Sequence, residues 1–220
     1  GNVAVERGEL EEAEKLLNEA LAMHKRSENR RGESIVLTGL GVVNGMRGEL
    51  KEAKHYFSLA LDIHRDMGNR RSEGVVLGNL SVCSSSAEEV EEAVEYAERA
   101  LDIHRETRNR KSMGVALVNL GSYYKRLGRI EEAIQSMKES LKLSRETGDL
   151  RTEIGAGVGL CNMLADMGKL ESALEQYTMA IKAAERSGLS RQLLGLVDSV
   201  REKLMAAGIP ERDLPLPSYW

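Results

Sequence analysis

The sequence predicts an all-α protein: a right-handed α-solenoid of stacked helical hairpins that ends in a C-terminal capping helix. Three observations predict this fold. The chain contains an internal repeat of 40 residues, each repeat holds two segments with helical periodicity, and small residues stand where two helices must cross closely. A single hairpin of this size cannot bury its apolar face, so the hairpins must stack into a curved array with a concave side.

The repeat runs through five units without a gap, and three of its columns each hold residues of one kind. The first column is apolar, the second is alanine throughout, and the third is leucine or isoleucine. The columns are Leu10, Leu50, Val90, Ile130 and Leu170; Ala13, Ala53, Ala93, Ala133 and Ala173; and Leu21, Leu61, Leu101, Leu141 and Ile181. Agreement of this kind indicates repeated copies of one supersecondary unit.

Each repeat is expected to hold two helices. Between Gly128 and Gly148, apolar residues recur at steps of three and four, which is the spacing of a buried helix face. The first helices are expected to begin after residues that cap helix N-termini well, namely Asn29, Asn69, Asn109 and Asp149. The close helix crossings are expected at small residues, namely Gly41, Ser81, Gly121 and Cys161.

The third repeat departs from this pattern at the turn between its two helices. Glu88 stands where other repeats have a turn glycine such as Gly128. Ser86 and Glu89 have the spacing of a capping box, so we expect this pair to start the following helix cleanly.

The chain is expected to divide into three segments. Residues 1–187 form the repeat array, whose first repeat is truncated at its N-terminus, residues 188–207 form the capping helix, and residues 208–220 form a proline-rich tail. The chain lacks a starting methionine and begins inside a repeat, so we expect a fragment of a longer protein. The tail is expected to fold back onto the last hairpin or onto a neighbouring molecule through its apolar residues, namely Leu214, Leu216, Tyr219 and Trp220.

Composition argues against several classes of partner. The chain has 31 basic and 35 acidic residues and a formal net charge of −4, which does not favour binding to nucleic acid. It has no apolar run of about 18 residues, so we expect no membrane partner. The two cysteines, Cys83 and Cys161, lie far apart and predict a reducing, cytoplasmic environment.

We expect the protein not to be an enzyme and to need no cofactor, because the sequence holds no catalytic motif. His24, His64 and His104 recur at one position of successive repeats, and a metal site would require them to converge. Neighbouring helix axes stand about 8–10 Å apart, which is too far for these histidines to share one ion, so their origin from copies of one repeat explains their recurrence better. Each histidine is then expected to be a cation near a helix C-terminus, where it is mildly stabilising. The glycine-rich segment 155–159 lies in a helical register and indicates close backbone approach, not a phosphate loop.

Basic residues also recur along the loops between repeats, namely Arg30 and Arg31, Arg70 and Arg71, Arg110 and Lys111, and Arg151. They could dock an acidic partner. Such charges more often form a solvated edge that is paired with nearby carboxylates, here Glu33 and Glu73, and we prefer this interpretation.

Two repeats carry the spacings of a known signature: Leu120, Gly121, Tyr124, Gly128, Ala133, Met137 and Ser140, and, matching better still, Leu40, Gly41, Gly48, Ala53, Phe57 and Ala60. The chain thus resembles the tetratricopeptide repeat (TPR) family, with units longer than the usual length of about 34 residues. These long units are similar to the repeats of LGN/Pins polarity proteins and of bacterial signalling ATPases, and more distantly to kinesin light chains. The resemblance covers residues 1 to about 187 and implies a protein-binding scaffold.

The resemblance also implies which surface binds a ligand, because in this family the inner face of the first helices lines a groove. The matching columns are Ile35, Val75, Val115 and Gly155; Thr38, Gly78, Val118 and Val158; Gly39, Asn79, Asn119 and Gly159; and Val42, Val82, Ser122 and Asn162. The residues expected to contact a peptide are Thr38, Val42, Val75, Asn79, Val82, Val115, Val118, Asn119, Ser122, Lys125, Arg126, Val158 and Asn162.

These columns predict a small apolar groove with a glycine floor and amides at Asn79, Asn119 and Asn162. Repeats that clamp the acidic C-terminus of chaperones have lysine in the second column, which holds none here, so that function is not expected. We expect a protein or peptide ligand, extended or helical, with apolar anchors, and a role as a regulatory or sensing arm of a larger protein. The alternative is a structural spacer, or a domain that self-associates through its array ends or its tail, without a peptide ligand.

Overall fold

The structure of the chain is a computed structural model that describes residues 2–186 and 191–214. Within these residues the chain forms ten α-helices, one short 3-10 helix and tight turns. The α-helices are α1 (Asn2–Arg26), α2 (Arg30–Met46), α3 (Leu50–Asp66), α4 (Arg70–Ser86), α5 (Val90–Glu106), α6 (Arg110–Arg126), α7 (Ile130–Thr147), α8 (Leu150–Asp166), α9 (Leu170–Arg186) and α10 (Arg191–Ala206), and the 3-10 helix is η1 (Glu211–Asp213). None of these helices is long and apolar enough to cross a membrane.

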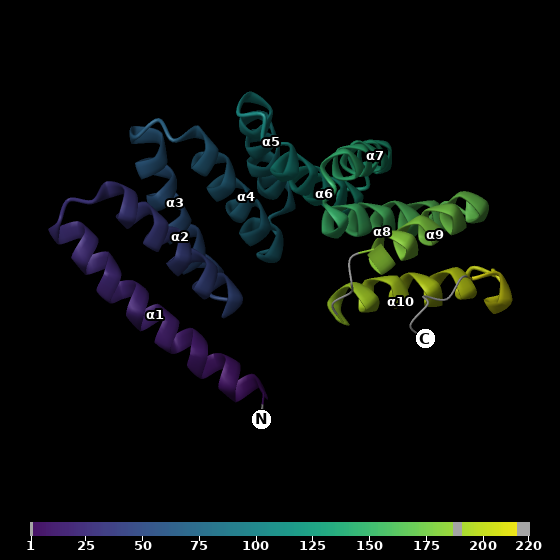
Figure 1. Cartoon of the computed structure of the whole chain (residues 1–220), viewed down its shortest axis with the longest axis horizontal. Helices are drawn as coiled ribbons and strands as arrows, with labels where there is room; N and C mark the ends of the chain where they lie inside the picture. The colour runs from purple at the N-terminus through teal and green to yellow at the C-terminus, as the bar shows by residue number, and fades with distance from the viewer. Residues whose placement is uncertain (1, 187–190, 215–220) are drawn as a thin grey trace. The chain divides into compact units, whose positions relative to one another are not determined.

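The chain divides into two compact units, Gly1–Arg108 and Asn109–Trp220, which we call the first and the second unit. In the first unit α2 pairs with α3 and α4 with α5, while α3 also packs on α4. In the second unit α6 pairs with α7 and α8 with α9, while α7 packs on α8 (Figure 1). Each unit is therefore a stack of antiparallel helical hairpins, as the repeat predicts.

The predicted N-caps of the first helices are confirmed. The side chains of Asn29, Asn69 and Asn109 each accept a hydrogen bond from the backbone N–H three residues later, over 2.9, 3.3 and 3.4 Å. Asp149 does the same for Thr152. Each cap satisfies a backbone donor at the helix start that would otherwise lack a partner, which stabilises a helix by about 1 kcal/mol.

The turn of the third repeat differs from the expectation. Ser86 is the last residue of α4 and donates its hydroxyl to the carbonyl of Val82, while the N-cap Glu89 makes no side-chain capping bond, so the predicted capping box is wrong. The reason is that Glu88 adopts the left-handed conformation of the turn glycines, with φ of 63°, beside 74° at Gly128. The turn therefore keeps the geometry of the other repeats, with the strain of a side chain at positive φ.

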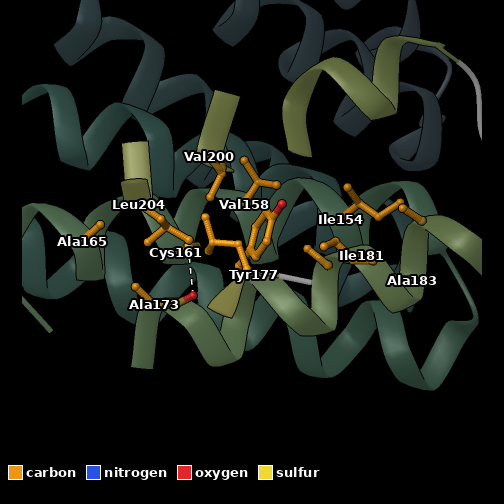
Figure 2. Packing of buried hydrophobic residues seen from close by; sticks show 13 residues of the cluster. Ile154, Val158, Cys161, Ala165, Ala173, Tyr177, Ile181, Ala183, Val200 and Leu204 are labelled. Atoms are coloured by element: carbon orange, nitrogen blue, oxygen red, sulfur yellow. Dashed lines mark hydrogen bonds between the residues drawn. The ribbon is translucent and has the colours of Figure 1, made fainter. Parts of the chain in front are cut away.

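Small residues do lie at the close helix crossings. A Cβ atom at Gly41 would come within 2.5 Å of the Phe57 ring, and one at Gly121 within 2.8 Å of the Met137 side chain. Cys161 is fully buried at the corresponding place, where its thiol donates to the carbonyl of Ala173 (Figure 2). These positions let the first helix of each hairpin approach the second closely enough to bury a large side chain between them.

The capping helix α10 closes the second unit, where it packs on both α8 and α9. Val200 and Leu204 of α10 point into the core around Tyr177 (Figure 2). The beginning of the tail joins this core, since Leu214 is buried in it and Ile209 packs against it. The predicted docking of Leu216, Tyr219 and Trp220 concerns positions outside the described residues.

Candidate functional site

A pocket of about 300 Å³ opens in the first unit between α2 and α4. We call it the inner pocket, and its lining residues are Gly41, Val42, Gly45, Met46, Leu50, Phe57, Asn79, Val82, Cys83 and Ser86. Three of them, Val42, Asn79 and Val82, were predicted to contact a peptide. The structure thus brings together residues from two successive first helices, as repeat geometry requires of a groove.

The inner pocket is apolar at its mouth and at its floor. Val42 and Val82 are 42% and 48% exposed, and Met46, one helical turn after Val42, is 69% exposed. Phe57 forms part of the floor and is buried. Exposed aliphatic side chains around a recess lose unfavourable contact with water when a ligand covers them.

The buried thiol in the inner pocket belongs to Cys83. It donates a hydrogen bond to the carbonyl of Leu50 over 3.3 Å, and burial raises its pKa. A thiol that stays protonated is a poor nucleophile. Cys83 therefore serves as a small apolar floor residue.

Asn79 is the residue with a side-chain amide in the lining of the inner pocket. It is half-buried and makes no hydrogen bond with any residue that the structure describes. Its amide can thus both donate to and accept from a ligand. Thr38, another predicted contact on α2, differs, because its hydroxyl donates to the carbonyl of Ser34 within its own helix.

The remaining predicted contacts of the first unit and the matching ones of the second unit lie on the first helices. Val75 of α4 is exposed, as are Val115 and Ser122 of α6, while Val118, Asn119 and Asn162 are half-buried. The side chains of Asn119 and Asn162 form no hydrogen bond within the described part of the chain. Asn79 of the first unit and Asn119 and Asn162 of the second unit therefore each offer a side-chain amide that is free to pair with a ligand.

Two predicted contacts of the second unit are placed differently from the expectation. Val158 is only 6% exposed, because it lies in the core that α10 covers with Val200 and Leu204 (Figure 2). Lys125 is exposed but engaged, with its ammonium 2.9 Å from Asp166, which also accepts Lys203 of α10. These two lysines hold the pKa of Asp166 below its usual value. Arg126, also a predicted contact, is exposed at the end of α6.

Several arginines that were expected in the inter-repeat loops are the first residues of helices α2, α4 and α6, and they are paired within their own unit. Arg70 lies 2.6 Å from Glu73 and 2.7 Å from Glu106, and Arg110 pairs with Glu146. Burial alone would raise the pKa of Glu73, but hydrogen bonds from Arg65 and Arg70 outweigh it and hold that pKa below its usual value. The interpretation of these charges as a paired edge is confirmed for Arg30 as well, which lies 3.1 Å from Glu33.

The buried histidines differ from the expectation of cations near helix ends. His64 and His104 are each 4% exposed, and burial lowers the pKa of both, with Arg71 lowering that of His104 further. The expected cationic state is therefore wrong for these two, because removal from water disfavours the charged ring. In the part of the chain that the structure describes, no group of three or more His, Cys, Asp or Glu side chains is arranged to hold a metal ion.

Sequence reasoning missed Met46, Gly45 and Phe57 as parts of the inner pocket. A signal for Met46 was present, since it follows Val42 by four residues and so lies on the same helix face. Phe57 was assigned to the family signature as a packing residue, and the structure shows that it packs and lines the pocket at once.

Stacked helical hairpins with an exposed apolar pocket define the class of protein-interaction repeat scaffolds. The sequence pattern of the MalT-like TPR region matches residues 80–198, and that of the tetratricopeptide repeat matches residues 1–66. The chain therefore belongs to the tetratricopeptide repeat family. No curated protein matches the sequence.

Solved structures share this fold at low sequence identity. BtubC from P. vanneervenii is 15% identical, with a TM-score of 0.74, and the match covers 93% of this chain and 89% of that one. The tetratricopeptide-sensor STAND protein of Pyrococcus horikoshii is 21% identical, with a TM-score of 0.73, over 94% of this chain and 30% of that one. A Rap protein complexed with competence and sporulation factor is 19% identical, with a TM-score of 0.64, over 92% and 62%.

Proposed function

We propose that this chain binds a peptide or helix of a partner protein along the inner face of its first helices, as a regulatory or sensing arm of a larger cytoplasmic protein. The observation that carries the proposal is the inner pocket, which the exposed Val42 and Val82 line together with Asn79. An apolar recess with a free amide in its lining suits a ligand that inserts an apolar side chain beside its own backbone.

Two contributions to binding follow from the lining. An aliphatic ligand side chain that enters the pocket would remove apolar surface from water, which is worth about 25 cal/mol per Å². The Asn79 amide would pair with a backbone N–H or C=O of the ligand. This hydrogen bond sets the register of the ligand in the groove more than its affinity, because the amide and the ligand backbone each give up a hydrogen bond to water when they pair.

In the second unit, the same roles fall to Val115, Val118, Asn119, Ser122 and Asn162. Val158 contributes through packing beneath α10 and not through contact with a ligand. Lys125 contributes less than a free lysine would, because Asp166 already neutralises it. The relatives support a ligand-binding array, since one is described as a sensor and another is complexed with a factor.

The test begins with a peptide-display library selected on the immobilised full chain. A selected peptide is then titrated against wild type, Val42→Glu and Asn79→Ala. We expect Val42→Glu to weaken binding by at least about tenfold, because the new charge would be buried without a partner. We expect Asn79→Ala to cost about 1–3 kcal/mol of binding free energy.

The matched control is Leu59→Glu, which places the same charge on an exposed leucine of α3 outside the inner pocket. It should leave the isotherm unchanged, and circular dichroism should show that all variants are folded. A peptide that ignores Val42→Glu and Asn79→Ala but is lost with Arg70→Ala and Arg71→Ala would contradict the proposal. A chain that selects no peptide at all would favour the structural spacer.

A further inference from the structure

The second unit carries another recess, on the side of its second helices. It has a volume of about 410 Å³ and is lined by Lys138, Leu141, Lys142, Arg145, Glu146, Leu160 and Gln176 of α7, α8 and α9. We call it the outer cleft. A smaller recess adjoins it, shares Leu141, Arg145 and Gln176 with it, and extends it to the exposed Met179. The predicted peptide contacts do not line it.

Three of the seven residues that line the outer cleft belong to the framework that the repeats share. Two repeats earlier, at positions lower by 80, the sequence has the same residues as Leu141, Arg145 and Leu160. The leucines are buried in both units, and Arg145 binds the buried Glu153 over 3.2 Å as Arg65 binds Glu73 over 3.1 Å. These residues hold the hairpins together, and this structural role explains why they recur in both units without any role in binding a ligand.

The rest of the lining changes between the units. Gln176 stands where the first unit has Tyr96, whose ring packs against the core and lies under the guanidinium of Arg99. Glutamine has no ring to cover the leucines beneath it, and the space remains open. The outer cleft therefore lacks an aromatic side chain that packs on the core at the matching position of the first unit.

The charge of the rim changes as well. Lys138 and Lys142 replace Ser58 and Asp62 of the first unit. They lie one helical turn apart, a spacing at which like charges repel, and neither forms an ion pair within the described residues. The other charged groups of the cleft are engaged, Arg145 with Glu153 and Glu146 with Arg110.

We propose that the outer cleft is a second docking surface, which takes an acidic segment of a partner protein with one aliphatic anchor. The anchor would sit over Leu141 and Leu160, its flanking carboxylates would meet Lys138 and Lys142, and the free side-chain amide of Gln176 would bind the backbone. We choose an acidic partner because its carboxylates would complement the two unpaired lysines, which stand out on a chain whose net charge is −4. A small inorganic anion would leave the leucine floor unused.

The experiment uses the full chain and two pools of short fluorescent peptides. In the acidic pool each peptide has one Leu, Ile or Val between pairs of Asp or Glu, and in the second pool serine replaces the acids. Anisotropy is measured for wild type, for Gln176→Tyr, and for the double variant Lys138→Ser with Lys142→Asp, which both copy the first unit. A double variant of exposed first-unit lysines, Lys25→Ser with Lys51→Asp, makes the same change in net charge.

We expect acidic peptides to bind wild type better than serine peptides, with an affinity that falls as salt rises. Each cleft variant should weaken this binding by about tenfold, while the first-unit double variant and Val42→Glu of the inner pocket should not. The lysine pair is exposed, so its replacement tests the proposal even if Gln176→Tyr folds poorly. Equal binding of the two pools, or binding that survives the Lys138 and Lys142 changes, would overturn it.

Discussion

Each of the two units buries an aromatic side chain in the same column of the repeat, but the two units use these side chains differently. Phe57 of the first unit and Tyr177 of the second are both buried, three repeats apart. Phe57 also forms the floor of the inner pocket, whereas Tyr177 is enclosed by Val200 and Leu204 of α10 (Figure 2). The repeat thus specifies that a large side chain is buried there, and the neighbouring elements decide whether a ligand can reach it.

Truncation of these two side chains gives the largest expected effect. Phe57→Ala and Tyr177→Ala should each lower the free energy of unfolding by about 3–5 kcal/mol, because each leaves a cavity in a packed core. Urea denaturation measures the loss. Only Phe57→Ala should also weaken a peptide selected on the inner pocket, and an equal loss of binding in Tyr177→Ala would break the comparison.

The next effect concerns pH, because the column of His64 and His104 continues as Ser144 and Ala184 in the second unit. Burial holds the histidine pKa values of the folded state below the ordinary 6.5. Glu73 opposes this shift at His64, and Arg71 adds to it at His104. The unfolded chain therefore binds protons more readily than the folded one, and stability present above about pH 6.5 should be lost as the pH falls below it.

Hydrogen exchange between about pH 7 and about pH 5.5 should show the first unit losing protection more than the second, after correction for intrinsic rates. The double variant His64→Ser with His104→Ala copies the second unit and should flatten this difference. If the variant keeps the full pH dependence, the two buried histidines do not carry it and this prediction is wrong.

The smallest effect distinguishes α8 from α6. Gly155, Gly157 and Gly159 stand where α6 has Val115, Leu117 and Asn119, and interior glycine costs about 0.8–1 kcal/mol relative to alanine. Amides of residues 153–166 should therefore exchange faster than those of residues 111–127. Equal or slower exchange in α8 would contradict this prediction.

A matched pair of substitutions sharpens the prediction for α8. A Cβ atom at Gly155 would meet no atom closer than 4.0 Å, whereas one at Gly159 would lie 2.7 Å from the Met137 methyl carbon. Gly155→Ala should stabilise the protein by about 0.4–1 kcal/mol, as read from the urea midpoint. Gly159→Ala should gain less, because Met137 has to move.

Much of the fold could be predicted from sequence because it follows from local and periodic rules. The caps at Asn29, Asn69 and Asn109 and the close crossing at Gly41 each depend on a few residues at fixed spacing. Glu88 marks the limit of such rules, since the geometry of the neighbouring repeats prevailed over local capping chemistry.

The candidate site was less predictable, because its accessibility depends on elements that do not obey the repeat. Val158 has the spacing of a groove residue, but α10 covers it. Lys125 has the spacing of a ligand contact, but Asp166, a distant residue in sequence, neutralises it. The outer cleft has Gln176 at the position where Tyr96 packs on the core of the first unit, and this difference is seen only when the repeats and their packing are compared.

The two cysteines have a practical consequence, since each unit contains one. Both are buried, and burial raises the pKa of both thiols, that of Cys161 to about 12. Cys161 therefore offers an alkylating reagent neither a surface nor a thiolate until α8 leaves its neighbours, so its labelling rate would report the opening of the second unit. Cys83 lies on the floor of the inner pocket, so its labelling rate would also depend on whether a ligand fills that pocket.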